Sequence, residues 1–279
     1  MAKVISPSKQ KPWEPIPDGI VTNVRIAQNV VAAYNTGHPE FCEYGEPREE
    51  VVSICGSGPS LADTYKSLRG DIWACNDAHN FLLDHGVVPK YAMVWDPQGP
   101  EVPGCPAYCF RETHPDVTYL IASMCDPAVF EKVKNNKVLI WHPDLGETVP
   151  ILDWLKGCGS KARVAVGGMT SGAVGRSMQF AYEMGYRKME VHGTDGSTRN
   201  GYIHFDELEC DRNQEIIDAK CFGRQFFTTP QMYRQAQEFP PLMEGLVNVN
   251  KADVRIHGDG LIPWVAAVFG WHVNSPRAA

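Results

Sequence analysis

Short strand-like runs alternate with helix-length segments from Val51 onward, and this rhythm constrains the fold more than any other feature of the sequence. The runs are rich in β-branched and aromatic residues, and the chain between them is long enough for the crossovers that parallel strands need. They read VVSIC, DIWAC, YAMVW, TYLIA, KVLIWH, RVAVG, MEVHG and VRIHG. The sequence therefore predicts an α/β fold with a mainly parallel sheet and helices on both faces.

The same pattern predicts how the chain is divided. With 279 residues and 43% hydrophobic content, the chain can bury one large core. Residues 1–46 contain several prolines, and we expect an N-terminal extension there with one short helix over residues 23–34. Residues 47–279 are expected to form a single domain. Within it, residues 201–250 carry no strong strand and are predicted to form an insertion of helices and loops, broken at Pro240-Pro241.

Composition restricts the class of protein. The formal net charge of −7 leaves no excess of cations for non-specific binding to nucleic acids, so a nucleic-acid acceptor is disfavoured. No apolar run approaches the roughly 20 residues of a membrane span, and the first residues lack the apolar segment of a secretion signal. A cytoplasmic protein is expected. The nine scattered cysteines favour reduced thiols, and a homo-oligomer is compatible with all these features.

A first glycine-rich turn follows the run VVSIC and reads Gly-Ser-Gly-Pro-Ser. Its glycines allow a tight turn and close approach of the backbone to a ligand, and the N–H groups at the next helix start face an anion. The candidate ligand-binding residues are Gly56, Ser57, Gly58 and Ser60. Leu61 stands where a dinucleotide fingerprint needs its third glycine, which disfavours NAD. The alternative is a tight strand-to-helix connection without a ligand.

A second turn, Gly167–Gly172, repeats this arrangement between the run RVAVG and a long helix predicted over residues 170–186. Its hydroxyls and N–H groups suit phosphate oxygens, although they could instead only cap the helix. Ligands of open parallel sheets bind beyond the carboxyl ends of the strands. We therefore expect the two turns to lie within one ligand's length of each other, with the second turn contributing Gly168, Thr170, Ser171 and Gly172.

Other predicted strands also end in polar residues. Asn76 follows DIWAC, Asp96 and Gln98 follow YAMVW, and Asp195 follows MEVH. Carboxylates and amides at one sheet edge suit a ribose, a base, an acceptor hydroxyl or Mg²⁺, and Asp96 and Asp195 are the candidate Mg²⁺ ligands. Each residue taken alone could instead be a turn-forming Asx residue.

Three segments together carry a family resemblance: GSGPSL, ACNDAHNFLLDHGVVPKYAMVWDP and GGMTSGAVGRSMQFAYEMGYRKMEVHGTDGS. This ordered set resembles the MptE-like 6-hydroxymethylpterin diphosphokinases, a family similar to motility accessory factor glycosyltransferases and Campylobacter-type sialyltransferases. The resemblance implies a Rossmann-like transferase whose donor is ATP or a CMP-linked sugar. It also places the first turn and Asn76 around the nucleotide and Thr170, Ser171 and Gly172 near its phosphate.

The resemblance leaves the proton acceptor open. The related sialyltransferases use a histidine before a late helix, and the matching segment here, Phe222–Gln225, contains none. His204, in the loop GYIHFD, or Asp195 is predicted to activate the hydroxyl of a small-molecule or glycan acceptor. Diphosphate transfer would need Mg²⁺, whereas glycosyl transfer of the related type can proceed without it. The alternative from another class is a non-catalytic nucleotide-binding or assembly protein that keeps the fold.

Overall fold

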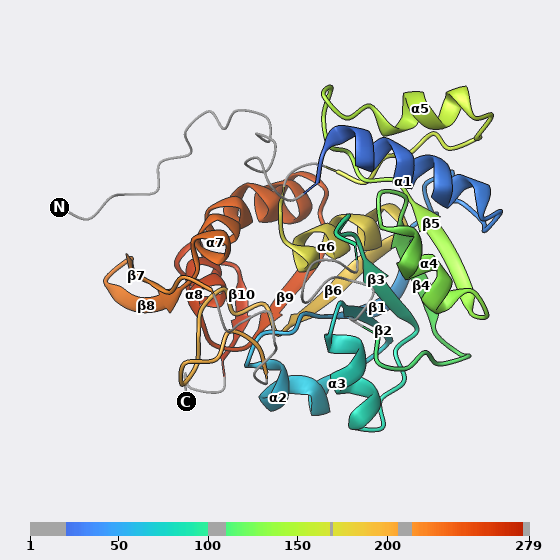
Figure 1. Ribbon diagram of the computed structural model, residues 1–279. Coiled ribbons are helices and arrows are strands. Elements are labelled where there is room, and N and C mark those ends of the chain that lie inside the picture. The colour runs from blue at the N-terminus through green and yellow to red at the C-terminus, as the bar shows by residue number, and fades with distance from the viewer. Residues whose placement is uncertain (1–20, 100–109, 168–169, 206–213, 276–279) are drawn as a thin grey trace. The chain divides into compact units, whose positions relative to one another are not determined.

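The computed structural model describes residues 21–99, 110–167, 170–205 and 214–275 (Figure 1). Its helices are α1 (Asn23–Asn35), α2 (Leu61–Thr64), the 3₁₀ turn η1 (Tyr65–Ser67), α3 (Ala78–Asp84), α4 (Pro127–Val133), α5 (Ile151–Gly157), α6 (Ala173–Glu183), α7 (Pro230–Met243), the π-helix η4 (Glu244–Val249) and α8 (Leu261–Val268). Its strands are β1 (Arg48–Cys55), β2 (Asp71–Cys75), β3 (Tyr91–Val94), β4 (Thr118–Ala122), β5 (Lys137–Trp141), β6 (Tyr186–His192), β7 (Ile217–Cys221), β8 (Arg224–Thr228), β9 (Asp253–His257) and β10 (His272–Asn274).

The strands form a mainly parallel sheet in the order β10-β9-β6-β1-β2-β3-β4-β5, and β7 and β8 form a separate antiparallel hairpin. The ladders β1–β6, β6–β9 and β9–β10 are parallel, as are β2–β3, β3–β4 and β4–β5. Seven of the eight predicted strand segments are strands of this sheet. The predicted α/β, Rossmann-like fold class is therefore confirmed.

The described residues divide into two compact units. The first unit holds residues 47–72, 170–205 and 214–275, and the second holds residues 21–46, 73–99 and 110–167. The predicted boundary between an N-terminal extension and one domain, at residues 46 and 47, stays a prediction.

In the first unit, helix α6 packs against β6 and β1. Its apolar face buries Met178, Phe180 and Ala181, and Gly185 follows the helix with φ 100°, a left-handed conformation that suits glycine. The helix predicted over residues 170–186 is thus confirmed, and it starts at Ala173, after the second glycine-rich turn.

In the second unit, α1 packs against α4 and α5. Thr22 caps this helix, since its side chain accepts a hydrogen bond from the Arg25 backbone N–H, and Ile26 and Val30 are buried on one face. Arg25 also pairs with Asp126 at 2.6 Å. The helix predicted over residues 23–34 is confirmed.

The prediction of a strand at RVAVG was wrong. Val166 forms only an isolated parallel bridge with Pro143, in which its N–H donates to the carbonyl of His142 and its carbonyl accepts from Asp144. Proline has no N–H to donate, so β5 ends before Pro143, and Val166 meets the chain only beyond the end of that strand. The second glycine-rich turn therefore follows an irregular segment.

Residues 201–250 were predicted to form helices and loops without a strong strand, but besides α7 and η4 they contain a two-stranded hairpin. Strands β7 and β8 are joined by a two-residue turn in which Phe222 and Gly223 have φ of 46° and 84°. A tight turn with two positive φ values matches the twist of a hairpin, and glycine suits the second position. The short, mixed sequence of these strands conceals the hairpin from a search for strongly apolar runs.

The Pro240-Pro241 pair lies inside α7, so the predicted break at this point was wrong as well. Proline removes backbone hydrogen bonds from a helix, but Phe239, Leu242 and Met243 are buried, and their packing keeps the segment helical. The π-helix η4 follows directly. None of the helices among the described residues combines the length and the apolar character that crossing a membrane requires.

Candidate functional site

The first glycine-rich turn lies against the turn that follows β6. The N–H groups of Gly56 and Gly58 donate to the carbonyls of His192 and Gly193, at 2.8 and 2.9 Å. A β-carbon on Gly56 would lie 2.5 Å from the Gly193 carbonyl oxygen, and one on Gly58 would overlap the Asp195 carboxylate. Close packing between two neighbouring turns thus accounts for both glycines.

Asp195 joins these two turns. Its Oδ2 atom accepts hydrogen bonds from the backbone N–H of Ser60 at 2.9 Å and from the Ser60 hydroxyl at 3.0 Å. Ser60 is fully buried and Asp195 is 3% exposed. Burial raises the pKa of Asp195 to about 6, while the two bonds from Ser60 and the charge of Arg199 act in the opposite direction.

The second oxygen of Asp195, Oδ1, is buried and has no hydrogen-bond partner among the described residues. One carboxylate oxygen therefore holds the first turn in place, and only the other is left for a ligand, a proton or Mg²⁺. This geometry suits a positioning role, and the catalytic and Mg²⁺-binding roles predicted for Asp195 stay predictions.

In the second turn, the donors of Ser171 converge on one anionic atom. The Ser171 N–H and hydroxyl lie 2.7 and 2.8 Å from Oε2 of Glu238, which belongs to α7. The other oxygen of Glu238 accepts from Arg234 Nε at 2.9 Å. Thr170 is buried, and its hydroxyl oxygen accepts from the Gly172 N–H at 3.2 Å. The second turn thus binds a carboxylate just before α6 begins.

The two turns adjoin each other. A β-carbon on Gly56 would lie 2.6 Å from Cγ2 of Val174, in the first turn of α6. This contact confirms the prediction that the turns lie within one ligand's length. Gly168 lies outside the described residues, so its predicted role stays a prediction.

The loop that carries His204 reaches the first turn. The N–H of Phe205, the next residue, donates to the carbonyl oxygen of Ser57 at 2.9 Å, and Ile203 on the other side is buried. His204 itself is half-buried. A histidine is thereby brought next to a residue predicted to bind the nucleotide.

The remaining predicted residues belong to the second unit. Asn76 has φ 50°, and its side-chain Oδ1 is buried without a hydrogen-bond partner among the described residues. Asparagine tolerates this left-handed conformation better than most residues, and such backbone strain is often found at functional sites. An orphaned acceptor of this kind suits a donor such as a ribose hydroxyl.

Asp96 forms an Asx turn, in which its Oδ1 accepts from the Gln98 N–H at 2.9 Å. Burial raises the pKa of Asp96, and the bond from Gln98 partly opposes that shift. The turn thus uses one carboxylate oxygen of Asp96 as an acceptor within the chain. The roles predicted for Asp96 and Gln98 in binding the acceptor or Mg²⁺ stay predictions.

Sequence reasoning missed two groups of functional candidates. It did not identify Glu238 as the partner of Ser171, and no local pattern signals a contact between residues 67 positions apart. It also missed that Glu190 and His257 lie beside His192. A signal existed there, because MEVHG and VRIHG both end in His-Gly and form neighbouring parallel strands.

Comparison with known proteins gives a family and a fold. A family model described as "6-hydroxymethylpterin diphosphokinase MptE-like" matches residues 25–201. Among solved structures, the MAf glycosyltransferase from Magnetospirillum magneticum AMB-1 has a TM-score of 0.63 and 17% sequence identity over 94% of this chain and 39% of that chain. This similarity concerns the fold, and the chain spans well under half of that glycosyltransferase's length.

A second solved structure is the sialyltransferase CstII from Campylobacter jejuni, in complex with the substrate analogue cytidine-5′-monophosphate. It has a TM-score of 0.40 and 12% identity over 81% of this chain and 85% of that chain. No curated protein matches the sequence.

Proposed function

The chain belongs to the 6-hydroxymethylpterin diphosphokinase MptE-like family, and on that basis we propose that it is a nucleotide-dependent transferase that binds a donor phosphate at Ser171. The observation that carries this proposal is the convergence of the Ser171 N–H and hydroxyl on one oxygen of Glu238. Two donors aimed at one anionic oxygen also suit a phosphate oxygen.

The position of Ser171 strengthens the proposal. The turn directly precedes α6, a helix of 11 residues, whose N-terminal end carries a partial positive charge. Helix α2, after the first turn, has only 4 residues and a correspondingly small dipole. The phosphate is therefore assigned to the second turn, and the first turn is assigned to the sugar or base of the nucleotide.

Glu238 competes with the phosphate for the same donors. A phosphate at Ser171 would displace the carboxylate, and Arg234, which now pairs with Glu238, is a cation within reach of the same place. The ligand-free arrangement thus keeps the donors of Ser171 satisfied until a stronger anion arrives.

The reaction we propose is diphosphate transfer from ATP to the hydroxymethyl group of a pterin, as the family description suggests. The hydroxyl oxygen attacks the β-phosphorus of ATP, the bond from that phosphorus to the oxygen bridging it to the α-phosphate breaks, and AMP leaves. His204 is proposed to accept the hydroxyl proton, because its loop touches the first turn at Ser57. Asp195 is proposed to position the first turn through Ser60.

The donor class can be identified by thermal-shift and calorimetric titration with ATP, GTP, CTP, CMP, CMP-sugars and UDP-sugars, each with and without Mg²⁺. A ligand that binds only the native state raises its apparent stability. ATP with Mg²⁺ is expected to bind, and AMP is expected to form when 6-hydroxymethylpterin is added. Binding of a nucleotide-sugar with release of its nucleotide would replace diphosphate transfer by glycosyl transfer. Nucleotide binding without turnover of any donor would favour the non-catalytic alternative.

Ser171→Ala is expected to weaken nucleotide binding about fivefold, or by about 1 kcal/mol. The loss is moderate because the variant keeps the backbone N–H and because the free protein also loses its hydroxyl bond to Glu238. Calorimetry measures the dissociation constant. Thr170 is left intact, since its hydroxyl oxygen accepts from Gly172 and its loss would disturb the turn itself.

Thr22→Ala is the matched control for Ser171→Ala. It removes the N-cap of α1, in the other unit, and should lower stability without changing nucleotide affinity. An unchanged dissociation constant for Ser171→Ala would show that the Ser171 hydroxyl binds only Glu238 and no donor phosphate.

Glu238→Gln is expected to tighten nucleotide binding by about fivefold, because a neutral amide competes less well for the Ser171 donors than a carboxylate does. Glu244→Gln, which removes a charge six residues further along the chain at the start of η4, should leave affinity unchanged, since Glu244 pairs with Asn248. Equal affinities for wild type and Glu238→Gln would contradict the proposed competition.

A further inference from the structure

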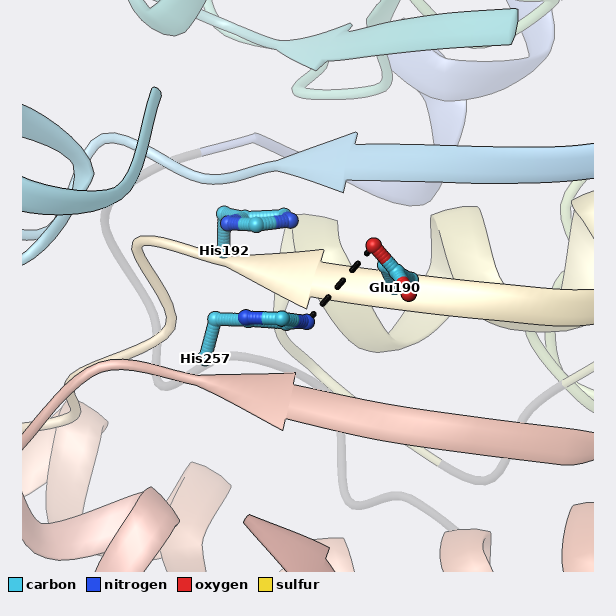
Figure 2. A group of neighbouring side chains, drawn as sticks. All are labelled: Glu190, His192 and His257. Carbon is cyan, nitrogen blue, oxygen red and sulfur yellow. Dashed lines mark ion pairs between the residues drawn. The ribbon is translucent and has the colours of Figure 1, made fainter. Parts of the chain in front are cut away.

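Three potential metal ligands share one face of β6 and β9. These strands are parallel neighbours, with His192 opposite His257, and Glu190 lies two residues before His192 on the same face (Figure 2). The two imidazoles stack at 4.2 Å with an interplanar angle of 13°, and Glu190 Oε2 is 3.7 Å from His257 Nε2. One ligand atom from each of the three side chains lies within 4.8 Å of those of the other two.

Three buried ring nitrogens of the two histidines have no hydrogen-bond partner among the described residues. His192 is fully buried, yet neither of its ring nitrogens has a hydrogen-bond partner among the described residues, and the buried Nε2 of His257 has none either. A buried polar atom without a partner costs about 1–3 kcal/mol. Burial lowers the pKa of His192 to about 3 and also lowers that of His257, where the charge of Glu190 acts in the opposite direction.

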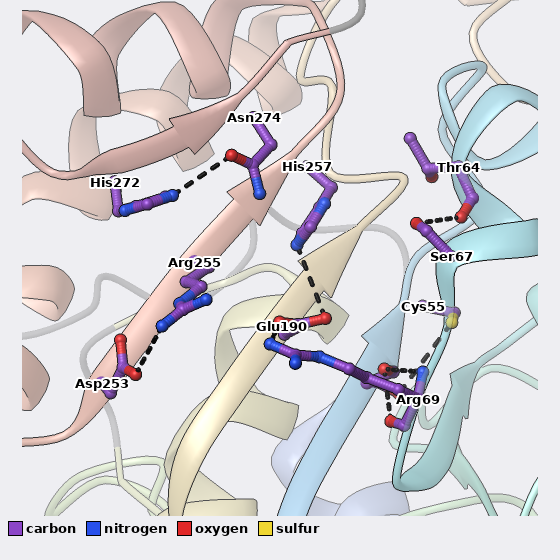
Figure 3. Close-up of polar contacts among 11 residues, drawn as sticks. Cys55, Thr64, Ser67, Arg69, Glu190, Asp253, Arg255, His257, His272 and Asn274 are labelled. Atoms are coloured by element: carbon purple, nitrogen blue, oxygen red, sulfur yellow. Dashed lines mark hydrogen bonds and ion pairs between the residues drawn. The ribbon is translucent and has the colours of Figure 1, made fainter.

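Glu190 is held in place by a neighbouring side chain. Its Oε1 atom pairs with the guanidinium of Arg69 (Figure 3). The backbone N–H and carbonyl of Arg69 are both bonded to the Ser53 hydroxyl, at 3.0 and 2.8 Å. An outer hydrogen bond of this kind orients a ligating carboxylate. The arrangement leaves Oε2, on the His257 side, for an ion.

We propose that Glu190, His192 and His257 form a binding site for one divalent transition-metal ion of the zinc class. Two imidazoles and one carboxylate are a ligand set that zinc accepts, with a fourth position open to another ligand. In tetrahedral coordination at about 2.1 Å, ligand atoms lie about 3.4 Å apart, so small side-chain rotations would have to bring the three groups together and unstack the rings.

A surface cavity adjoins one of the three proposed ligands. Glu190 borders this cavity of about 310 Å³, which Arg69, Lys188, Asp253 and Arg255 also line. Two of these cations are paired, since Lys188 lies 2.5 Å from Glu49 and Arg255 lies 3.3 Å from Asp253. The charges that would oppose a metal are therefore largely compensated, and an anion or water from the cavity can supply the fourth ligand.

Zinc binding by the 279-residue chain tests the proposal. The protein, first treated with a chelator and dialysed, is titrated with Zn²⁺ in competition with a chromophoric chelator, and Co²⁺ is used as a spectroscopic probe. One Zn²⁺ per chain should bind, and Co²⁺ should give visible bands of a low-coordinate nitrogen and oxygen site. His257→Ala should weaken Zn²⁺ binding at least tenfold, because loss of an outer-sphere partner alone costs about 10–100-fold.

His272→Ala is the matched control, since His272 is an exposed histidine on the adjacent strand β10. Glu190→Gln provides a second variant, and circular dichroism establishes that each variant is folded. Absence of stoichiometric binding, equal Zn²⁺ affinity of His257→Ala and wild type, or Co²⁺ bands from cysteine thiolates would each overturn the proposal.

Discussion

Between pH 4 and pH 7, the free energy of unfolding of the wild type is expected to fall by about 2.4 kcal/mol relative to that of Asp195→Asn. The cause is burial, which raises the pKa of Asp195 from the ordinary value of 3.8 to about 6 in the folded chain. Below pH 3.8 the side chain is protonated in both states and contributes no difference. As the pH rises to 6, the unfolded chain loses this proton first, so the wild type loses stability.

Asparagine cannot ionise, so the variant lacks this loss. Its carbonyl oxygen can still accept from the N–H and hydroxyl of Ser60, and the variant should therefore fold. Denaturant unfolding of both proteins at several pH values measures the difference in unfolding free energy. The contributions of the other carboxylates cancel in this difference, because both proteins contain them.

Thr22→Ala serves as the control, because it removes the N-cap of α1 and no ionisable group, so its loss of stability should not depend on pH. A difference for Asp195→Asn that stays constant from pH 4 to pH 7 would contradict the burial of an uncompensated carboxylate. Asp195→Ala should unfold more easily at every pH, since it leaves the buried donors of Ser60 without an acceptor.

Regular, local features of this fold could be predicted from the sequence. Strands buried in a parallel sheet must be apolar along their whole length, so runs such as TYLIA and KVLIW stand out against their flanks. Helix α6 could be predicted because its apolar residues recur at helical spacing and a glycine follows it. The closeness of the two glycine-rich turns was also predicted, because ligands of open parallel sheets bind beyond the carboxyl ends of the strands.

The features that could not be predicted depend on distant partners. Val166 has the composition of a strand, but the neighbour that would extend its ladder is Pro143. The bond between Ser60 and Asp195 joins residues 135 positions apart, and it turns a predicted catalytic carboxylate toward the first turn. The sequence pattern suggested that Gly58 lets the backbone approach a ligand. In the structure, the Asp195 carboxylate occupies the space that a side chain at position 58 would need.

Replacing His204 by asparagine is expected to lower the turnover of the transferase reaction by about 10²- to 10⁴-fold, the usual contribution of a general base. Asparagine keeps a polar side chain of similar size on the loop that contacts Ser57, but it cannot take the acceptor proton. The nucleotide should bind with unchanged affinity, because the phosphate is assigned to Ser171 and not to this loop.

The measurement is kcat for release of AMP from ATP in the presence of the acceptor, with the nucleotide dissociation constant determined separately. His272→Ala, at an exposed histidine on β10, should have the kcat of the wild type. A His204→Asn protein with undiminished kcat would transfer the proton-accepting role to Oδ1 of Asp195, the one buried oxygen at the turns that lacks a partner among the described residues. A joint loss of kcat and nucleotide affinity would instead show that His204 holds the loop against Ser57, because a general base affects the chemical step and not ground-state binding.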